Sequence, residues 1–501
     1  MKPFHAALVV LNVSIAFAAW AEEQGTPQPA GSSPAGQEAV ANASSEQQKE
    51  APASSQLVAQ TQQASPGVPP MAQQPTGPVS PQSAPPPPSA LKMGNLSIAL
   101  YGFLLFDAHW NEVGFGTAPF MDPDAELNKK VNASTRYDFP IFANGMPGGF
   151  IMSIRQSRLG ARLELPTPDI ATTLRGRLEF DLLGGFLTST NAISWFTPLP
   201  RLRLAFLSAA WKLGDRASIG FVAGQDTGLF APVSAVSAAL NGGPVFGAAG
   251  NTGGVRSPQF RLEGEVGGDV AMTWGLGVLS PADNFSNDAS IQVVQADFGP
   301  GNRAARPNFE ARLALVYKQD KKSVLELGVS GHRGWETYVV QGGNAMVPGG
   351  GIAADLQGNF GVVGVRGEAF TGKNMDSVIG NFFTDGVTLV GASSTSTPPT
   401  SVVPIRTRGG WGQLVLQPLR VLQVFGGVGV EDPNNQDLST NPATKTFNRQ
   451  FHAGTIILPA KAWTLGAEWM KTTTHYAGVL PRSGKSVLSG NHLALSTTFT
   501  F

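Results

Sequence analysis

The sequence predicts an all-β fold: a transmembrane antiparallel β-barrel of about 16 strands that follows a disordered N-terminal segment rich in Pro, Gln, Ala and Ser. Short segments with alternating apolar and polar residues recur from residue 96 onward, as strands between two media require. The chain has no cysteine, and none of its apolar runs is long enough for a membrane-spanning helix. If the chain spans a membrane, it must therefore do so with strands. A closed barrel is the arrangement in which every backbone polar group of such strands is hydrogen-bonded within lipid.

Residues 1–21 have the pattern of a secretory signal peptide. Lys2 supplies a positive charge, an apolar stretch follows, and Ala19 and Ala21 provide the small residues of a cleavage site. We therefore expect export and a mature chain that begins at Glu22. A buried N-terminal helix is the alternative interpretation of the same residues.

Residues 22–95 consist mostly of Pro, Gln, Ala and Ser. This composition offers few aromatic or branched side chains to bury, so we expect a disordered periplasmic segment, partly in the polyproline II conformation. It either contacts a periplasmic partner or the cell wall, or it is simply a leader ahead of the barrel, which residues 96–501 are expected to form.

The barrel strands are predicted from alternating segments separated by turns. Tight connections, such as Gly267-Gly268 and Pro459-Ala460, alternate with long ones, such as residues 109–150 and 371–408. Bacterial barrels have this asymmetry, with short periplasmic turns and long outer loops. The expected strands cover residues 96–108, 152–165, 172–183, 201–213, 217–224, 257–266, 269–279, 306–317, 323–332, 350–358, 362–370, 409–417, 419–431, 447–458, 461–473 and 488–501.

The third of these strands indicates how the two faces of the barrel differ. Each charged group would cost about 2 to 4 kcal/mol in the middle of a bilayer, so the charged face must meet water. A barrel of about 16 strands encloses an aqueous channel, whereas one of about 8 is filled by side chains. The apolar face holds Leu174, Leu178, Phe180 and Leu182, and the polar face holds Thr173, Arg175, Arg177, Glu179 and Asp181.

The last strand alternates in the same way and closes on an aromatic residue. Leu493, Leu495 and Phe499 share one face with Phe501, and polar residues lie between them. Such a strand resembles the terminal strands of bacterial outer-membrane barrels, in which the final aromatic residue belongs to the signal that the insertion machinery reads. The resemblance implies an assembly role for Phe501.

Five short motifs follow one another with the spacing of barrel strands. They are Ile98-Ala99-Leu100-Tyr101-Gly102-Phe103 with Asp107, Ser157-Arg158-Leu159-Gly160, Gly176-Arg177-Leu178-Glu179-Phe180-Asp181, Gly224-Gln225 and Pro258-Gln259-Phe260-Arg261. Together they resemble the DcaP-like trimeric porins of the outer membrane. The resemblance implies a homotrimer in outer-membrane lipid that passes small anions such as dicarboxylates. Residues 22–95 depart from the family, whose members often have a helical, Gln-containing segment there.

Residues 225–256, which follow the fifth strand, would form the third outer loop. General porins fold this loop inward, so the resemblance makes it the constriction of the pore. After Asp226 the loop has no charged residue before Arg256. A loop that folds over the barrel mouth without lining the pore is the alternative. The candidates for the constriction are Gln225, Asp226, Phe230 and Phe246.

Arginines dominate the wall expected to face this loop. Their guanidinium groups stay charged and carry several donors, so a row of them can pass a carboxylate or phosphate along a channel. Acidic residues lie on the same wall. The alternative is therefore a structural lattice in which these acids pair with the arginines. The pore-wall candidates are Arg158, Arg162, Arg175, Arg177, Glu179, Asp181, Arg203, Arg261 and Arg312.

Composition and motifs argue against other functional classes. The 35 basic and 35 acidic residues give a formal net charge of zero, which argues against nucleic-acid binding. The six histidines lack metal-ligand spacing, and neither a catalytic serine motif nor a phosphate loop is present. We therefore expect no enzyme activity, metal or cofactor, although a serine–histidine pair across strands would revive a hydrolase. A structural or adhesive barrel tethered by the Pro-rich segment remains as the alternative function.

Overall fold

The computed structural model describes residues 91–115, 143–167, 172–182, 200–239, 256–281, 299–319, 322–375, 378, 386–391, 398–481 and 483–501. Residues 1–90 lie outside this part of the chain, and with them the predicted signal peptide and most of the Pro-rich segment.

The described chain consists almost entirely of β-strands. They are β1 (Leu91–Met93), β2 (Leu96–Phe115), β3 (Ala143–Ser153), β4 (Arg158–Thr167), β5 (Thr172–Asp181), β6 (Arg201–Lys212), β7 (Ala217–Thr227), β8 (Arg256–Gly267), β9 (Val270–Leu279), β10 (Asn308–Gln319), β11 (Lys322–Val340), β12 (Gly343–Phe360), β13 (Val363–Lys373), β14 (Val387–Val390), β15 (Ser401–Pro404), β16 (Arg406–Leu419), β17 (Leu422–Pro433), β18 (Lys445–Ala460), β19 (Trp463–Leu480) and β20 (Lys485–Thr500). The helical elements are α4 (Pro300–Arg303) and the 3-10 turn η4 (Asn435–Asp437). No helix within these described ranges is long and apolar enough to cross a membrane.

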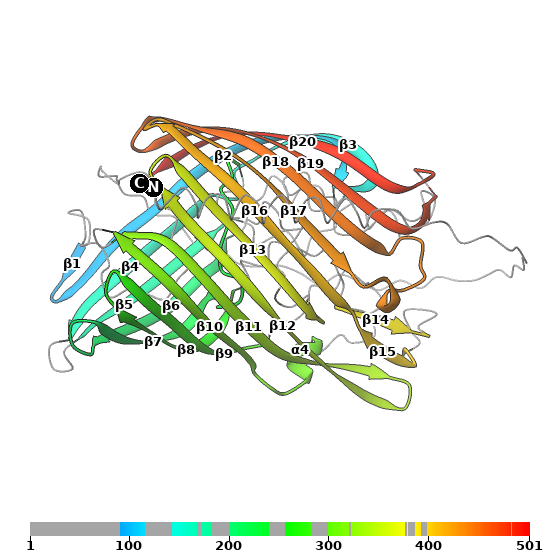
Figure 1. Ribbon diagram of the computed structural model, residues 1–501, viewed down its shortest axis with the longest axis horizontal. Coiled ribbons are helices and arrows are strands. Elements are labelled where there is room, and N and C mark those ends of the chain that lie inside the picture. The colour runs from blue at the N-terminus through cyan, green and yellow to red at the C-terminus, as the bar shows by residue number, and fades with distance from the viewer. Residues whose placement is uncertain are drawn as a thin grey trace, which may run out of the picture. The chain divides into compact units, whose positions relative to one another are not determined.

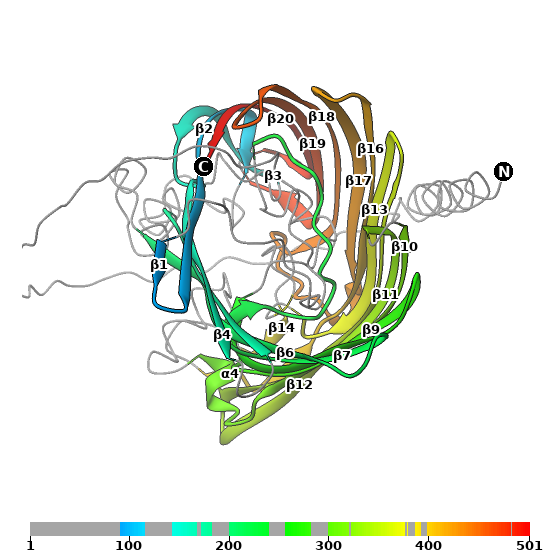
Figure 2. The same ribbon diagram turned by 90° about the vertical axis from the view of Figure 1, so that its left-hand side faces the viewer.

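Sixteen strand positions close into one antiparallel barrel (Figures 1 and 2). The strands pair in sequence order from β4 to β13 and from β16 to β20, β13 pairs with β16, and β2 joins the two ends of the row by pairing with β4 and β20. β3 and β4 share one position, because they pair with the second and first halves of β2, respectively. The predicted all-β barrel of about 16 strands is therefore confirmed.

The two ends of the barrel differ in their connections. At one end, tight turns join β6 to β7, β8 to β9 and β12 to β13. The C-terminus lies at this tight-turn end, on the left of Figure 1. The opposite end, named the long-loop end from this point, has the long connections after β7 and β13 and the small sheet of β14 and β15.

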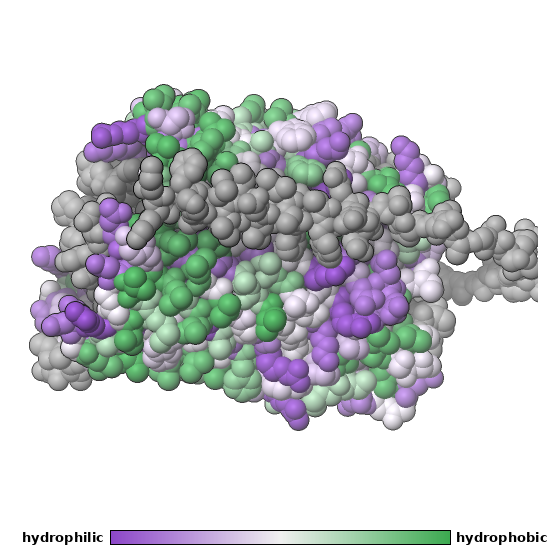
Figure 3. All heavy atoms as spheres, in the orientation of Figure 1, coloured by the Kyte–Doolittle hydropathy of each residue, from purple (hydrophilic) through white to green (hydrophobic). Residues whose placement is uncertain are grey.

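Alternation separates the side chains of each strand into an outer and an inner set. On β5, Leu178 and Phe180 are exposed on the outer surface, whereas Glu179 and Asp181 are buried. Outward apolar residues of the other strands extend this arrangement, and Figure 3 shows hydrophobic residues over the strands with hydrophilic ones toward both ends of the barrel. A barrel surrounded by lipid requires such an apolar band.

The hairpin of β11 and β12 is longer than the alternation predicted. Strands were expected at residues 323–332 and 350–358, but their pairing continues to Val340 and Gly343, with a tight turn at Gln341-Gly342. Gly342 has a φ of 89°, which glycine adopts without a steric penalty. Tyr338 and Val347 of this extension are buried in a cluster with Val387 of β14. Contact with a distant part of the chain imposes no lipid–water alternation, so the sequence does not reveal the extension.

Phe501 closes the seam of the barrel beside Gly102 on β2. The Gly102 amide donates to the Phe501 carbonyl oxygen and the Phe501 amide donates to the Gly102 carbonyl oxygen, both at 3.0 Å. A Cβ atom on Gly102 would lie 2.9 Å from the Phe501 ring, so the ring packs directly on the glycine. The seam thus depends on both the backbone and the side chain of the last residue.

Candidate pore-lining site

Beyond β7, residues 228–239 run along the inner surface of the barrel and are mostly buried. We name this stretch the inner segment. Figure 2 shows it as a green line inside the ring of strands. Hydrogen bonds attach it to side chains of β10, β11, β13, β16, β19 and β20. In addition, Gln156, between β3 and β4, donates to the Ala239 carbonyl oxygen at 3.1 Å.

Carboxylates of the wall bind both ends of the inner segment. Glu310 on β10 accepts the amide hydrogens of Leu229 and Phe230, at 2.5 and 3.1 Å. Glu468 on β19 accepts the amide hydrogen of Ala238 at 2.8 Å. Hydrogen bonds to ionised acceptors are stronger than neutral ones, so these two residues are the main anchors.

The middle of the inner segment is bound in the same way. Glu368 on β13 accepts the Val233 amide at 2.5 Å. Gln413 on β16 binds both polar groups of the Val236 backbone: its oxygen accepts the amide at 2.7 Å, and its nitrogen donates to the carbonyl at 2.8 Å. Side chains of the wall thus satisfy these buried backbone groups without a strand partner.

Two histidines complete the anchors. Nδ1 of His332 lies 3.0 Å from Glu310, and Nδ1 of His452 lies 2.8 Å from Glu468. In each carboxylate one oxygen binds the histidine and the other binds the inner segment. Within the described residues, no group of three His, Cys, Asp or Glu side chains is arranged to hold a metal ion.

The structure places Phe230 against the wall. Its side chain packs in a buried cluster with Ala353, Phe370 and Met375, and its ring centroid lies 6.1 Å from that of His332. The aromatic ring therefore fixes the inner segment to β11, β12 and β13. The backbone and the small residues of the segment, rather than this ring, lie along the barrel interior.

Two of the proposed constriction residues belong to a strand. The sequence interpretation began the loop at Gln225, but β7 continues to Thr227, because Gln225 and Asp226 still pair with β8. The side chain of Gln225 donates to two backbone carbonyls of β6, and Asp226 lies 3.0 Å from Arg261. Phe246 lies outside the described residues.

The arginines of β4, β5 and β6 gather around Glu179. Arg177 and Arg203 lie 2.8 and 2.9 Å from its carboxylate, and Arg158 lies 3.9 Å away. Arg203 also lies 3.0 Å from Asp181. The structure therefore brings these candidates together and contains the acid–arginine lattice that the sequence left open.

Tyr101 on β2 organises this lattice. Its hydroxyl donates to Glu179 at 2.9 Å and accepts a hydrogen bond from Arg177 at 2.6 Å. The guanidinium groups of Arg162 and Arg177 lie 4.6 and 5.1 Å from its ring centroid, a favourable cation–π geometry. Gly160 makes room for the ring, since a Cβ there would lie 2.5 Å from it. Tyr101 was not among the predicted wall residues, although the alternation of β2 places it on the inner face.

The lattice leaves its cations more exposed than its anions. The side chains of Arg177 and Arg158 are 17% and 13% exposed, whereas those of Glu179 and Asp181 are 3% and 1% exposed. The carboxylates thus lie deep in the lattice while the guanidinium groups keep surface.

The remaining wall candidates are also paired. Arg175 lies 3.5 Å from Glu164, and the two side chains are about equally exposed. Arg261 is buried and binds acids of β7 and β8. Arg312 is buried and lies 2.5 Å from Asp355. Arg261 and Arg312 therefore stabilise the wall and present little charge.

The chain was compared with known proteins. No protein-family model and no curated protein matches it. Among solved structures, it is similar to the outer membrane channel DcaP of Acinetobacter baumannii, with a TM-score of 0.57, 15% identity, and coverage of 82% of this chain and 99% of that one. It is also similar to an anion-selective porin from Comamonas acidovorans, with a TM-score of 0.45, 12% identity, and coverage of 81% and 100%. The chain therefore shares the barrel fold of the DcaP channel.

Proposed function

We propose that this chain is an outer-membrane porin of a diderm bacterium. It gives small hydrophilic solutes diffusive passage through a water-filled barrel and favours small anions such as dicarboxylates. The observation that carries the anion preference is the exposure of Arg158 and Arg177 above the covered carboxylates of Glu179 and Asp181.

The inner segment supports this preference. It carries no charged side chain between Gly228 and Ala239, and its amides occupy the carboxylates of Glu310, Glu368 and Glu468. These acids are therefore covered, and the arginine wall contributes the exposed charge. A low-dielectric barrel focuses that potential and raises the local anion concentration. The same segment, as part of the loop at residues 225–256, narrows the pore.

The proposal includes the surroundings of the barrel. The outward apolar band contacts outer-membrane lipid, and residues 1–21 direct export. The chain forms a homotrimer, as the DcaP-like resemblance implies, and has no enzymatic role. Residues 22–95 contact a periplasmic partner or the cell wall.

Reversal potential across a potassium chloride gradient in a planar bilayer tests the proposal. We expect a wild-type pore that prefers chloride at 0.1 M salt, where the Debye length is about 10 Å, and loses much of this preference at 1 M, where it is about 3 Å. The double variant Arg175→Ala/Arg177→Ala should shift the potential toward cations, and it should relieve block by succinate.

A matched control removes charge from the outer surface. Lys471 is exposed on β19, between the inward-facing residues Met470 and Thr472. Lys471→Ala should leave the reversal potential unchanged. A wild-type pore that prefers cations at low salt would contradict the anion preference but leave the porin function standing. Absence of any steady current would contradict the porin function and favour the structural or adhesive barrel.

A further inference from the structure

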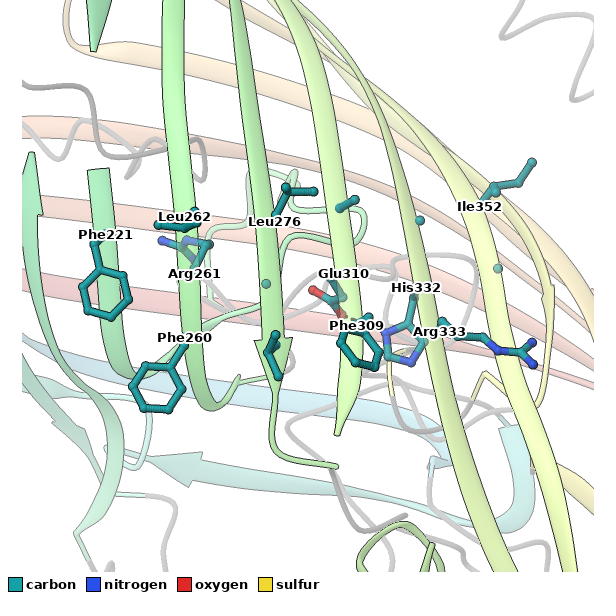
Figure 4. A pocket seen from close by; sticks show the side chains of 15 residues that line it. Phe221, Phe260, Arg261, Leu262, Leu276, Phe309, Glu310, His332, Arg333 and Ile352 are labelled. Carbon is teal, nitrogen blue, oxygen red and sulfur yellow. Dashed lines mark hydrogen bonds and ion pairs between the residues drawn. The ribbon is translucent and has the colours of Figure 1, made fainter. Parts of the chain in front are cut away.

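An apolar groove lies on the outer surface of β7 to β12 and is separate from the pore. Its cavity volume is about 830 Å³. Figure 4 shows Phe221, Phe260 and Phe309 along it, with Arg333 and Ile352 at its β11–β12 side. The apolar walls are highly exposed: Phe260 is 64% exposed and Ile352 is 67% exposed.

Small residues form the floor of the groove. Gly331 on β11 pairs with Ala311 on one side and with Ile352 on the other. A Cβ atom on Gly331 would find no atom nearer than the Gly351 carbonyl oxygen, at 3.8 Å. The position is therefore open, and the exposed side chain of Ile352 lies beside it. An extended hydrocarbon chain fits a depression of this kind.

Two basic side chains border the groove toward the long-loop end. Arg333 on β11 and Lys373 on β13 both pair with Gly350 on β12, so the three residues lie in one row across the sheet. Both side chains are exposed, whereas the adjacent His332, Gly334 and Asn374 are buried. Strands lie about 4.8 Å apart, so about 10 Å separates the two backbones. Gly350 has no side chain that would separate the two cations.

A third cation lies beside this pair. The guanidinium groups of Arg306 and Arg333 lie 5.6 and 5.2 Å from the ring centroid of Trp335. Farther along the row, Arg406 is paired with Asp437 at 2.7 Å. Within the part of the chain that the structure describes, no such acid pairs with Arg306, Arg333 or Lys373. Among the described residues, these three cations therefore have no acidic partner within ion-pair distance.

We propose that this surface binds a phosphorylated, multi-acyl lipid of the outer leaflet. A phosphate group lies over Gly350 between Arg333 and Lys373, and an acyl chain lies over Gly331 in the groove. Charge complementarity and the continuity of the basic row with the apolar groove both favour such a lipid over a second copy of the chain. A second copy would bring no excess of negative charge, since the net charge of the chain is zero. The inference rests on the proposed outer-membrane location but not on ion selectivity.

Binding of diphosphoryl lipid A to the full chain in detergent, followed by native mass spectrometry, tests this site. Arg333→Glu/Lys373→Glu should weaken binding at least tenfold. Lys471→Glu reverses one exposed charge on β19, away from the groove, and should bind like the wild type. Lipid A without phosphates should bind the wild type as weakly as diphosphoryl lipid A binds the double variant.

Filling the groove provides an independent test, because it leaves the cations in place. Gly331→Leu adds a side chain at an open position with no positive φ, so the barrel should fold. We expect it to weaken binding of diphosphoryl lipid A several-fold. Unchanged affinity in both the double variant and Gly331→Leu would overturn the proposal, and so would equal binding of dephosphorylated lipid A. The proposal would also be overturned if Gly331→Leu abolished self-association of the chain but left lipid binding unchanged. That result would indicate an interface between copies of the chain.

The lipid-binding results can be distinguished from failure of the proposed porin function. Lipid binding is measured without current, and the variants at Arg333, Lys373 and Gly331 change only the outer surface. Their reversal potentials should equal that of the wild type. A pore without steady current that still binds diphosphoryl lipid A through this surface would contradict the porin function and leave the lipid site standing.

Discussion

Glu468 accepts the amide hydrogen of Ala238 at 2.8 Å, across 230 positions of sequence. The contact attaches the inner segment to the middle of β19. Glu310 binds the other end of the same segment, so two buried carboxylates on separate strands keep an uncharged stretch of backbone inside the barrel. Because no strand partner is available there, side chains supply the hydrogen bonds that the segment needs.

Removal of both anchors should release the inner segment. Each hydrogen bond to a charged group contributes about 1.5 to 3 kcal/mol, so Glu310→Ala/Glu468→Ala should allow the segment to move. We expect a noisier single-channel conductance with a changed mean value, and faster cleavage of the segment by an added protease.

Glu326→Ala serves as the control for that experiment. Glu326 lies 2.8 Å from Arg312, and no hydrogen bond joins it to the inner segment within the described residues. Its variant should conduct with wild-type noise. Identical traces from the double variant and the wild type would mean that the carboxylates do not hold the segment in place.

Tyr101 should matter to the arginine wall in two separable ways. Tyr101→Phe removes the hydroxyl that joins Arg177 to Glu179 but keeps the ring. Loss of these hydrogen bonds should cost about 1 to 3 kcal/mol and lower the temperature at which the barrel loses its heat-modifiable migration on a gel.

Tyr101→Leu also removes the ring under Arg162 and Arg177. It should reduce block by succinate more than Tyr101→Phe does, because both guanidinium groups lose their fixed position. Equal block in the two variants would exclude a role for the ring in positioning the arginines.

Phe501 should be required for assembly. Deletion of Phe501 removes two backbone hydrogen bonds to Gly102, whereas Phe501→Asp keeps them and removes only the ring. We expect both variants to accumulate outside the outer-membrane fraction, and Phe501→Tyr to assemble normally, as measured by membrane fractionation. Normal assembly of Phe501→Asp would argue against recognition of the aromatic side chain.

The mature chain should begin at Glu22. Ala19 and Ala21 are the small residues that a signal-peptide cleavage site accepts. N-terminal mass spectrometry of the outer-membrane fraction measures the start directly. A start beyond Gly94 would show that the Pro-rich segment is removed and does not act as a tether.

The sequence by itself determined the strands and their faces. The alternation of Leu178 and Phe180 with Glu179 and Asp181 predicted which side of β5 faces outward, and the structure agrees. The physical reason is local: a strand between lipid and water must alternate with a period of two, whatever its neighbours are. The same rule failed for the ends of β7 and of the β11–β12 hairpin, where both faces meet the same medium or other protein.

Only the tertiary structure decided which groups meet. Glu310, Glu368 and Glu468 are isolated acids in the sequence, and their common partner is the backbone of residues 228–239, 80 or more positions away. Likewise, the register of β2 against β4, and of β4 against β5, places Tyr101 among the arginines. Backbone amides carry no sequence signature, and register depends on closure of the whole barrel, so neither the path of the inner segment nor the covering of the carboxylates follows from a local pattern.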